Sequence, residues 1–213
     1  MKVILLFAVI FAATIVSSSK LNCEHGKPDI PKDWLDMTDP CIKKMKDQIQ
    51  EELKASIQYL AMGAHFSKDT INRPGFAKFF FNAASEERQH ALKLIGYLLM
   101  RGELTMKVNK LIKKSIVPTT FTWSSGLSAL KDALKLEAFV TKSIHDVVKK
   151  CEEPSDGGFN DYHLVDYLTG EFLEEQYKGQ RDLAGKISNL EKMHRDHKVL
   201  GEFMFDKKLL DEL

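Results

Sequence analysis

Residues 76–97 carry the sequence FAKFFFNAASEERQHALKLIGY, in which apolar side chains recur at the three- and four-residue spacing of an α-helix. Pro74 before this stretch and Gly102 after it are typical helix boundaries, so we predict one helix in the interval between them. Glu87 and His90 fall in the middle of the apolar stripe. A buried carboxylate is costly unless a partner neutralises it, so this helix predicts a polar site inside a hydrophobic core. The apolar members of the stripe are Phe76, Phe80, Ala83, Leu94 and Tyr97.

Three further segments show the same pattern, an apolar helical stripe with a polar break. We expect helices over about residues 39–68, 122–153 and 161–193, with Asp39 as the N-cap of the first. No convincing segment has the two-residue period of a strand, so we predict an all-α fold. The stripes are Met45, Ile49, Leu53, Ser56 and Leu60, broken by Glu52 and Tyr59; Leu127, Leu130, Leu134, Ile144 and Val148, broken by Glu137; and Val165, Leu168, Phe172, Leu183 and Leu190, broken by Gln176.

The polar breaks have the chemistry of a metal site. Three buried glutamates that lie close together would repel one another, and a pair of metal ions would neutralise them. Carboxylate and imidazole ligands suit iron, and Glu87-x-x-His90 presents two ligands on one helical turn. Glu137 could then bridge toward a second metal. Any one of these residues alone is weak evidence, but six on four converging stripes predict a di-iron centre.

The long connection at residues 103–121 determines the topology. It has no clear period and contains Pro118. Helices of this length span about 40 Å, and 19 extended residues can reach about 60 Å. The connection can therefore run the length of the bundle and make the third helix parallel to the second, which gives a four-helix bundle with one long crossover. A short fifth helix is expected at about residues 200–207.

This topology makes a prediction about the three cysteines. If the third helix is antiparallel to the first, Cys41 in the first turn of one helix lies beside Cys151 in the last turn of the other. We predict that these two form a disulfide. Cys23 then has no partner in its own chain and is free to bond another subunit. The sequence contains no Cys-x-x-Cys pair that would indicate a zinc or redox motif.

The N-terminus has the layout of a secretory signal peptide: a basic start, an apolar run over residues 3–16 and small residues after it. A membrane anchor is the alternative, although the run is short for a bilayer span. With 31 basic and 30 acidic residues the charge is balanced, and no basic block suggests nucleic acid. We expect a secreted or secretory-pathway protein with no membrane span. Its expected parts are a signal peptide at 1–19, an arm at 20–39, the bundle at 40–207 and a tail at 208–213.

These motifs resemble the heavy-chain type of animal ferritins, and the arm together with the signal peptide resembles the secreted insect kind. The resemblance covers about residues 40–207. It rests on Glu52, Tyr59, the run Glu86-Glu87-Arg88-Gln89-His90, Leu136-Glu137, the stretch DYHLVDYLTGEFLEEQ at 161–176, and the arm Pro28-Asp29-Ile30-Pro31-Lys32-Asp33-Trp34.

The resemblance implies a hollow shell of two dozen subunits that oxidises Fe(II) with oxygen and stores a ferric mineral. The implied ferroxidase centre has Glu52, Glu87 and His90 around one iron, and Glu87, Glu137 and the region of Gln176 at the second. Tyr59 and Gln176 would support the ligands. All six positions match, whereas light-chain types lack several of them, so the resemblance implies a catalytic subunit.

Two departures from the family pattern concern nucleation and iron entry. Glu86 is kept on the cavity side of the second helix, but Gln89 and Leu92 stand where nucleation carboxylates often occur. Asp166 matches the acidic lining of the threefold channel, where Thr169 replaces a glutamate and His163 could line the mouth. A partner subunit of the light type would then supply nucleation.

Three other functions remain open at this point. A light-type subunit would store iron without oxidising it, and a soluble di-iron enzyme would oxidise an organic substrate. A secreted helical cytokine would have long helices and crossovers, but no reason to bury three glutamates and a histidine. The chain ends in Leu-Asp-Glu-Leu, which resembles a retention tail of the endoplasmic reticulum without its usual basic residue.

Overall fold

The computed structural model describes residues 29–104, 111–153 and 157–212. Residues 33–213 form one compact unit, separate from a unit at 1–32. The predicted signal peptide, Cys23 and the last residue of the retention-like tail lie outside the described residues.

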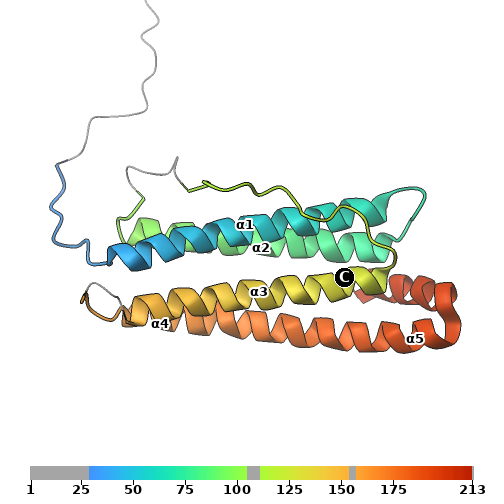
Figure 1. Cartoon of the computed structure of the whole chain (residues 1–213). Coiled ribbons are helices and arrows are strands. Elements are labelled where there is room, and N and C mark those ends of the chain that lie inside the picture. Colours follow the sequence, from blue (N-terminus) through green and yellow to red (C-terminus); the bar gives the residue numbers. More distant parts are fainter. Residues whose placement is uncertain (1–28, 105–110, 154–156, 213) are drawn as a thin grey trace, which may run out of the picture. The chain divides into compact units, whose positions relative to one another are not determined.

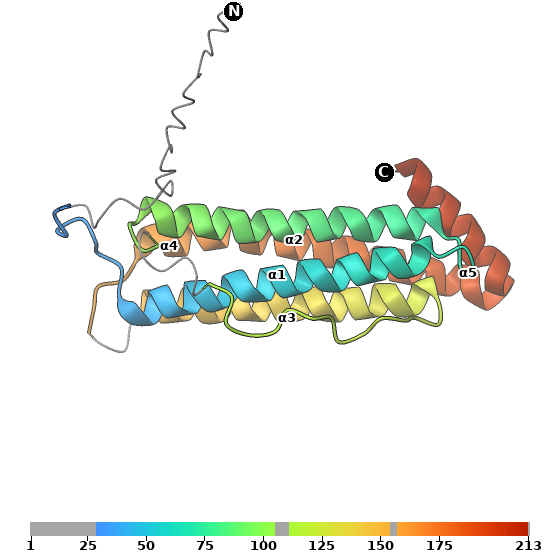
Figure 2. The same cartoon turned by 90° about the horizontal axis from the view of Figure 1, so that it is seen from above.

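Four long helical rods form two antiparallel pairs (Figure 1, Figure 2). The all-helical content agrees with the all-α prediction. The first pair is α1 (Asp39–Ser67) with α2 (Pro74–Met100). The second pair is α3 (Gly126–Glu152) with a composite rod of α4 (Tyr162–Tyr167), the π-helix η2 (Leu168–Leu173) and α5 (Glu174–Glu212). The described residues contain no strand. The fold is therefore the four-helix bundle with one long crossover that the sequence predicts.

The helix ends follow local chemistry, with two corrections to the predicted boundaries. Thr38 and not Asp39 is the N-cap of α1, and Asp39 lies in the first turn, where its charge suits the helix dipole. Helix α3 begins later than expected, after Ser125, whose side chain accepts from the backbone of Ser128 in a capping box. Gly102 follows α2 with φ of +74°, the left-handed conformation that glycine adopts at helix ends.

The π-helix in the fourth rod was not predicted from the sequence. The inward positions of this rod are Leu164, Leu168, Phe172 and Gln176, at successive four-residue steps. Each step overshoots a 3.6-residue turn, so in an ideal α-helix Gln176 would rotate by about 120° away from the line set by Leu164. The wider turns of η2 absorb this drift and keep Gln176 on the core side.

The last helical segment is longer than predicted. Lys198 has a non-helical backbone (φ 48°, ψ −122°) and divides α5 into a long rod and a final segment. This final segment continues to Glu212, so residues 208–212 are helical and not an irregular tail. Figure 2 shows the final segment turning back across the end of the bundle.

The hydrophobic core consists of two clusters. One contains Cys41, Met45, Ile49, Leu94 and Ile144, near the end of the bundle where α1 begins. The other contains Tyr59, Phe66, Phe76, Phe80, Leu130 and Leu183, toward the opposite end. The predicted stripes supply most of these residues. Leu60 is an exception, because its side chain is 48% exposed.

Three polar side chains of α1 hold the crossover, which runs along this helix (Figure 1). Gln50 Oε1 accepts the backbone N–H of Lys114 at 2.9 Å, and Gln58 Oε1 accepts that of Thr119 at 3.0 Å. His65 Nε2 lies 3.0 Å from the carbonyl oxygen of Trp123. These side chains satisfy backbone groups of a segment that has no secondary structure of its own. They therefore fix the path that makes α3 parallel to α2.

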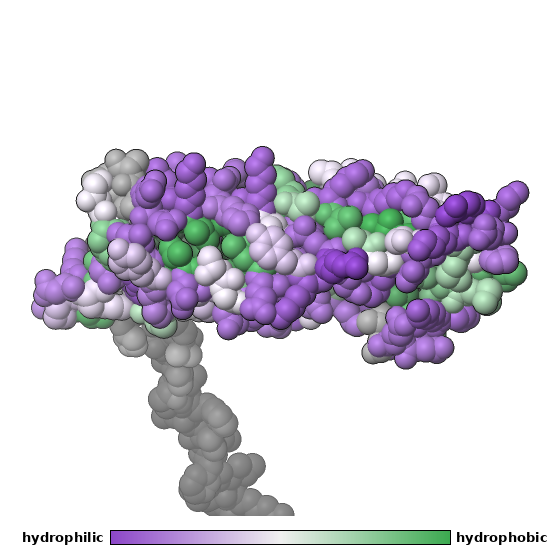
Figure 3. All heavy atoms as spheres, turned by 90° about the horizontal axis from the view of Figure 1, so that it is seen from below, coloured by the Kyte–Doolittle hydropathy of each residue, from purple (hydrophilic) through white to green (hydrophobic). Residues whose placement is uncertain are grey.

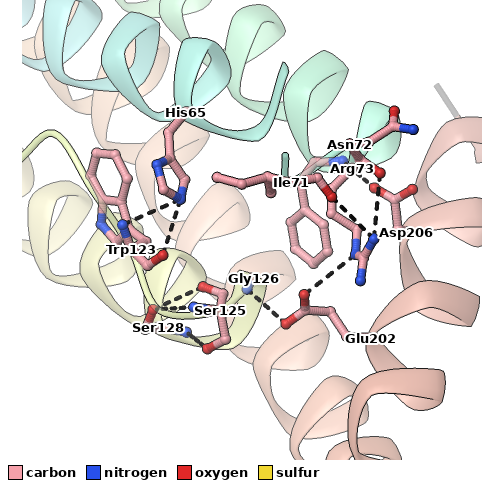
Figure 4. A network of polar contacts seen from close by, with 11 residues as sticks. His65, Ile71, Asn72, Arg73, Trp123, Ser125, Gly126, Ser128, Glu202 and Asp206 are labelled. Atoms are coloured by element: carbon pink, nitrogen blue, oxygen red, sulfur yellow. Dashed lines mark hydrogen bonds and ion pairs between the residues drawn. The ribbon is translucent and has the colours of Figure 1, made fainter. Parts of the chain in front are cut away.

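The final helical segment caps two other helices at the far end of the bundle (Figure 4). Asp206 Oδ1 accepts the backbone N–H of Phe76 at 3.0 Å in the first turn of α2. Glu202 Oε2 accepts the backbone N–H of Gly126 at 2.9 Å, and its other oxygen lies 3.4 Å from Arg73 Nε. Carboxylates at helix N-termini satisfy free N–H groups and suit the helix dipole. This segment therefore connects the N-termini of α2 and α3 at this end of the bundle.

None of the described helices is long and apolar enough to cross a membrane. Figure 3, which looks onto the side of α3 and the fourth rod, shows a mostly hydrophilic surface with separate apolar patches. Phe139 on α3 and Tyr177 on α5 are each about half exposed.

Cys41 and Cys151 are joined by a disulfide, the pairing that the topology predicts. Their separation in sequence is 110 residues, so the bridge restricts a long loop of the unfolded chain. Replacing both residues with alanine should lower the free energy of unfolding by about 4 kcal/mol. Urea unfolding without reductant, at matched protein concentration, measures this difference. Adding reductant to the wild type should give a similar loss.

The cysteine pairing can be tested by mass spectrometry of unreduced tryptic peptides. We expect a linked Cys41–Cys151 peptide pair. A Cys23–Cys41 link with a reduced Cys151 would contradict this pairing. A double variant that unfolds at the same urea concentration as the wild type would contradict the predicted stabilisation.

Candidate metal centre

All four rods contribute side chains to a polar cluster between the two apolar clusters. Helix α1 supplies Glu52 and, two turns later on the same face, Tyr59. Helix α2 supplies Glu87 and His90, whose three-residue spacing places both on one side. The last two, from α3 and α5, are Glu137 and Gln176. The six residues that break the predicted stripes are all buried and lie in one region of the core.

Glu52, Glu87 and His90 form the most compact part of the cluster. Each offers one ligand atom, and these three atoms lie within 4.8 Å of one another. His90 Nδ1 is 3.8 Å from Glu52 Oε2 and 3.7 Å from Glu87 Oε2. These same three buried atoms have no hydrogen-bond partner among the described residues. Unsatisfied buried oxygens and a ring nitrogen facing one point fit a divalent cation.

Glu137 occupies the other side of Glu87. The Tyr59 hydroxyl donates a hydrogen bond to Glu137 Oε1. Gln176 lies near this carboxylate, because both residues line the same cavity and Gln176 lowers the pKa of Glu137. Glu87 and Glu137 are near enough for the charge of Glu137 to raise the pKa of Glu87. Glu87 therefore lies between two carboxylates, the position that a ligand shared by two ions would need.

In the absence of a cation, burial and mutual repulsion oppose the ionisation of the three glutamate carboxyl groups. Burial raises the pKa of the Glu52 carboxyl well above its usual value, and the charge of Glu87 raises it further. Burial is also the main cause of the raised pKa of Glu87 and of Glu137. Removing these protons requires positive charge in the site, since like charges in a low dielectric repel strongly. Burial and the neighbouring glutamates also raise the pKa of Tyr59, which stays a hydrogen-bond donor.

A cavity of about 270 Å³ leads to the cluster between α2 and α5. Its walls carry the carboxylates of Glu86, Glu87, Glu137, Glu175 and Asp182. It is smaller than the roughly 300–1,000 Å³ of most pockets for organic ligands. Apolar side chains such as Phe79, Ala83 and Leu183 form much of the remaining wall, and the small size suits ions, water and dioxygen.

Sequence reasoning missed three residues that contact the cluster and a fourth, Gln180, that bonds to one of these three. Gln48 Nε2 donates to Glu52 Oε1 at 2.8 Å, and Glu175 Oε2 lies 3.2 Å from His90 Nε2. Thr141 and Gln180 bond to each other, with Thr141 Oγ1 also 2.8 Å from Gln176 Oε1. Gln48, Thr141 and Gln180 each lie four residues from a predicted site residue. That one-turn spacing is the signal that could have found these three.

The predicted channel and nucleation residues lie outside this cluster. Asp166 in α4 is exposed, and the Thr169 hydroxyl bonds to the Val165 carbonyl of its own rod at 2.9 Å. His163, predicted at a channel mouth, is also exposed, but its Nδ1 lies 2.8 Å from the Tyr97 hydroxyl. Glu86, Gln89 and Leu92 are exposed on α2.

The fold and site together define a class: helical bundles whose core presents carboxylates and histidine to metal ions. Comparison with known proteins identifies the family. The family model described as "Ferritin-like domain" matches residues 42–193. The chain belongs to the ferritin family.

Individual relatives are similar along nearly the whole chain. A protein named ferritin heavy chain from Trichoplusia ni is 59% identical over 208 residues, 98% of this chain and 97% of its own. The ferritin heavy chain of Drosophila melanogaster is 54% identical over 203 residues, 94% of this chain and 96% of its own. A crystal structure of Trichoplusia ni secreted ferritin matches with a TM-score of 0.84 and 62% identity, covering 89% of this chain and 98% of that one.

The raised pKa of Glu87 predicts how pH affects the stability of the metal-free protein. A carboxyl whose pKa is higher in the folded state contributes stability below its unfolded pKa and loses it as pH rises through the folded value. Glu87→Gln replaces this carboxyl with an amide that does not ionise, so the variant does not lose this stability as the pH rises. The variant should match the wild type near pH 4.5 and be more stable at pH 7, as measured by thermal unfolding in chelator.

Glu51→Gln is the control for this comparison, because Glu51 neighbours the site residue Glu52 in sequence but is only partly buried. It should show no such pH-dependent gain. A Glu87→Gln variant that is no more stable than the wild type at pH 7 would contradict the electrostatic account of the site.

Proposed function

We propose that this chain is a ferroxidase subunit that oxidises Fe(II) to Fe(III) with oxygen at the buried centre and stores the ferric iron. The observation that carries the proposal is the convergence of Glu52, Glu87 and His90, with three buried atoms that have no partner among the described residues. Iron here is the substrate and the stored product. Relatives named ferritin heavy chain support the same function.

Two ions would share the centre. Glu52, Glu87 and His90 bind one Fe(II), while Glu87 and Glu137 bind the second, with Gln176 beside it. Tyr59 orients Glu137 through its hydroxyl. Each Fe(II) would give up one electron, and one dioxygen molecule would accept both electrons and two protons and leave as hydrogen peroxide. The carboxylates favour this step because they stabilise Fe(III), the more highly charged product, more strongly than Fe(II).

The alternative functions are less consistent with these observations. A light-type subunit has no use for all six residues of the centre, which are present and buried here. Oxidation of an organic substrate would need a larger cavity than the one that leads to Glu87. A cytokine is incompatible with the family to which the chain belongs.

The proposed assembly is a shell of 24 subunits, shared with a light-type ferritin subunit that supplies the nucleation carboxylates missing at Gln89 and Leu92. Exposed apolar side chains such as Phe139 and Tyr177 provide surface for contacts between subunits. We further propose that the protein is secreted or resides in the secretory pathway. The disulfide and the similarity to the secreted ferritin of Trichoplusia ni support this location.

The catalytic assignment is tested by the double variant Glu87→Lys and His90→Gly. It places an ammonium where the two ions share a ligand and removes an imidazole. The rate of Fe(II) oxidation, followed by the absorbance of the ferric product, should fall to the uncatalysed background. The shell should still assemble, as gel filtration would show.

The control for this variant is Glu191→Lys, which changes an exposed glutamate that pairs with Lys131 on the bundle surface. It should oxidise iron at the wild-type rate. If the double variant assembles and also oxidises iron at the wild-type rate, the site is wrongly assigned.

Iron entry is the second proposed element of function. We place it at threefold channels lined by the start of the fourth rod, where three copies of Asp166 would surround each axis. Carboxylates around one axis raise the local concentration of Fe(II) by electrostatic focusing. With Thr169 in place of a second acidic ring, the focusing should be modest.

Asp166→Asn should therefore slow iron uptake at low ionic strength, and added salt should narrow the difference because it screens the carboxylates. Stopped-flow measurement of iron uptake at two salt concentrations tests this. Asp211→Asn, an exposed aspartate on the final helical segment, is the matched control. Uptake by Asp166→Asn at the wild-type rate in low salt would refute the channel assignment.

A further inference from the structure

A chain of hydrogen bonds between α3 and α5 lies directly behind the metal centre. Glu137 and Thr141 are one turn apart on α3, and Gln176 and Gln180 are one turn apart on α5. Thr141 Oγ1 lies 2.8 Å from Gln176 Oε1 and 2.6 Å from Gln180 Nε2. It also lies 2.8 Å from the backbone carbonyl oxygen of Glu137. Thr141 and Gln176 are both buried.

The direction of these bonds follows from the donors available. The Gln180 amide nitrogen can only donate, so the Thr141 oxygen accepts from it. The hydroxyl has one proton to give, and its two possible acceptors are the Glu137 backbone carbonyl and Gln176 Oε1. The backbone carbonyl already accepts a helical hydrogen bond from four residues further on. The Gln176 oxygen gains more from the hydroxyl, because an unsatisfied buried acceptor is costly.

This bonding order decides which end of the Gln176 amide faces the metal centre. With its oxygen on Thr141, the amide turns its nitrogen to the opposite side, toward the cavity that Gln176 and Glu137 both line. If the amide were reversed, its oxygen would face the carboxylate oxygens of Glu137 and would be free to bind an ion. The orientation of the Gln176 amide therefore decides whether Gln176 supports a metal ligand or is itself a metal ligand.

We propose that Thr141 and Gln180 are positioning residues that hold the Gln176 amide with its nitrogen toward Glu137, so that Gln176 orients this carboxylate and does not itself bind the second ion. This inference rests on the proposed two-ion centre and deepens it. Tyr59 and Gln176 then hold Glu137 from two sides and leave its remaining lone pairs for the metal. The ion held by Glu52, Glu87 and His90 does not depend on Thr141.

The test is an anaerobic titration of the metal-free protein with Co(II), followed by visible absorbance. The readout counts the ions per chain that bind at the centre and gives the affinity of each. Ions at the centre are those that a protein binds in excess of the double variant Glu87→Lys with His90→Gly. We expect two such ions for the wild type. Thr141→Val keeps the shape of the side chain but removes the hydroxyl, and should weaken only the second ion, by about 10- to 100-fold.

Three further variants separate positioning from a general loss of structure. Thr141→Ser restores the hydroxyl and should restore the second affinity. Gln180→Ala removes the donor to Thr141 and should weaken the second ion less than Thr141→Val does. Ser143→Ala, which removes a hydroxyl from the same helix outside this chain of bonds, should bind both ions as the wild type does.

The outcomes distinguish this inference from the proposed function. A Thr141→Val variant that binds both ions with wild-type affinity would overturn the positioning role and leave the two-ion centre intact. Equal weakening of both ions, together with a lower melting temperature, would also overturn it, because it would show a structural role only. A wild type that binds fewer than two ions would contradict the proposed centre itself.

Discussion

The repulsion among buried glutamates is the constraint on which the rest of the structure depends. Glu52, Glu87 and Glu137 are at most 9% exposed, and each has a raised pKa because burial disfavours its charge. A bundle of this size could fill the same space with leucine and be more stable. The chain instead keeps carboxylates that need cations to neutralise their charges. Its stability without metal is reduced so that the site has affinity for metal.

Several features outside the centre keep the helices in place despite this cost. The disulfide ties the start of α1 to the end of α3, and the final segment of α5 caps α2 and α3 at the opposite end. Gln50, Gln58 and His65 fix the crossover along α1. The centre lies between these restraints, where the rods can neither slide nor separate easily. A site whose ligands come from four rods needs such fixed ends, since a shift of one rod would move a ligand out of reach.

The sequence predicts the helices and the members of the centre because both depend on periodicity. Glu87 and His90 stand out only because Phe80 and Leu94 continue the same stripe on either side. The sequence does not predict the π-helix, because the four-residue spacing from Leu164 to Gln176 also fits the apolar face of an ordinary helix. Asp206 and Glu202 gave no signal either, since they look like exposed charges until the final segment folds across the bundle. Thr141 and Gln180 carry one sequence signal, their one-turn spacing from Glu137 and Gln176, but the bond between them is known only once α3 and α5 lie side by side.

The most direct test of the central claim is anomalous diffraction at the iron absorption edge from crystals soaked anaerobically with Fe(II). The account predicts two iron peaks in each subunit, one among Glu52, Glu87 and His90 and one between Glu87 and Glu137. Gln176 should lie beside the second peak with its nitrogen toward Glu137. Iron bound only at the subunit surface, with the buried carboxylates free of metal, would contradict the account.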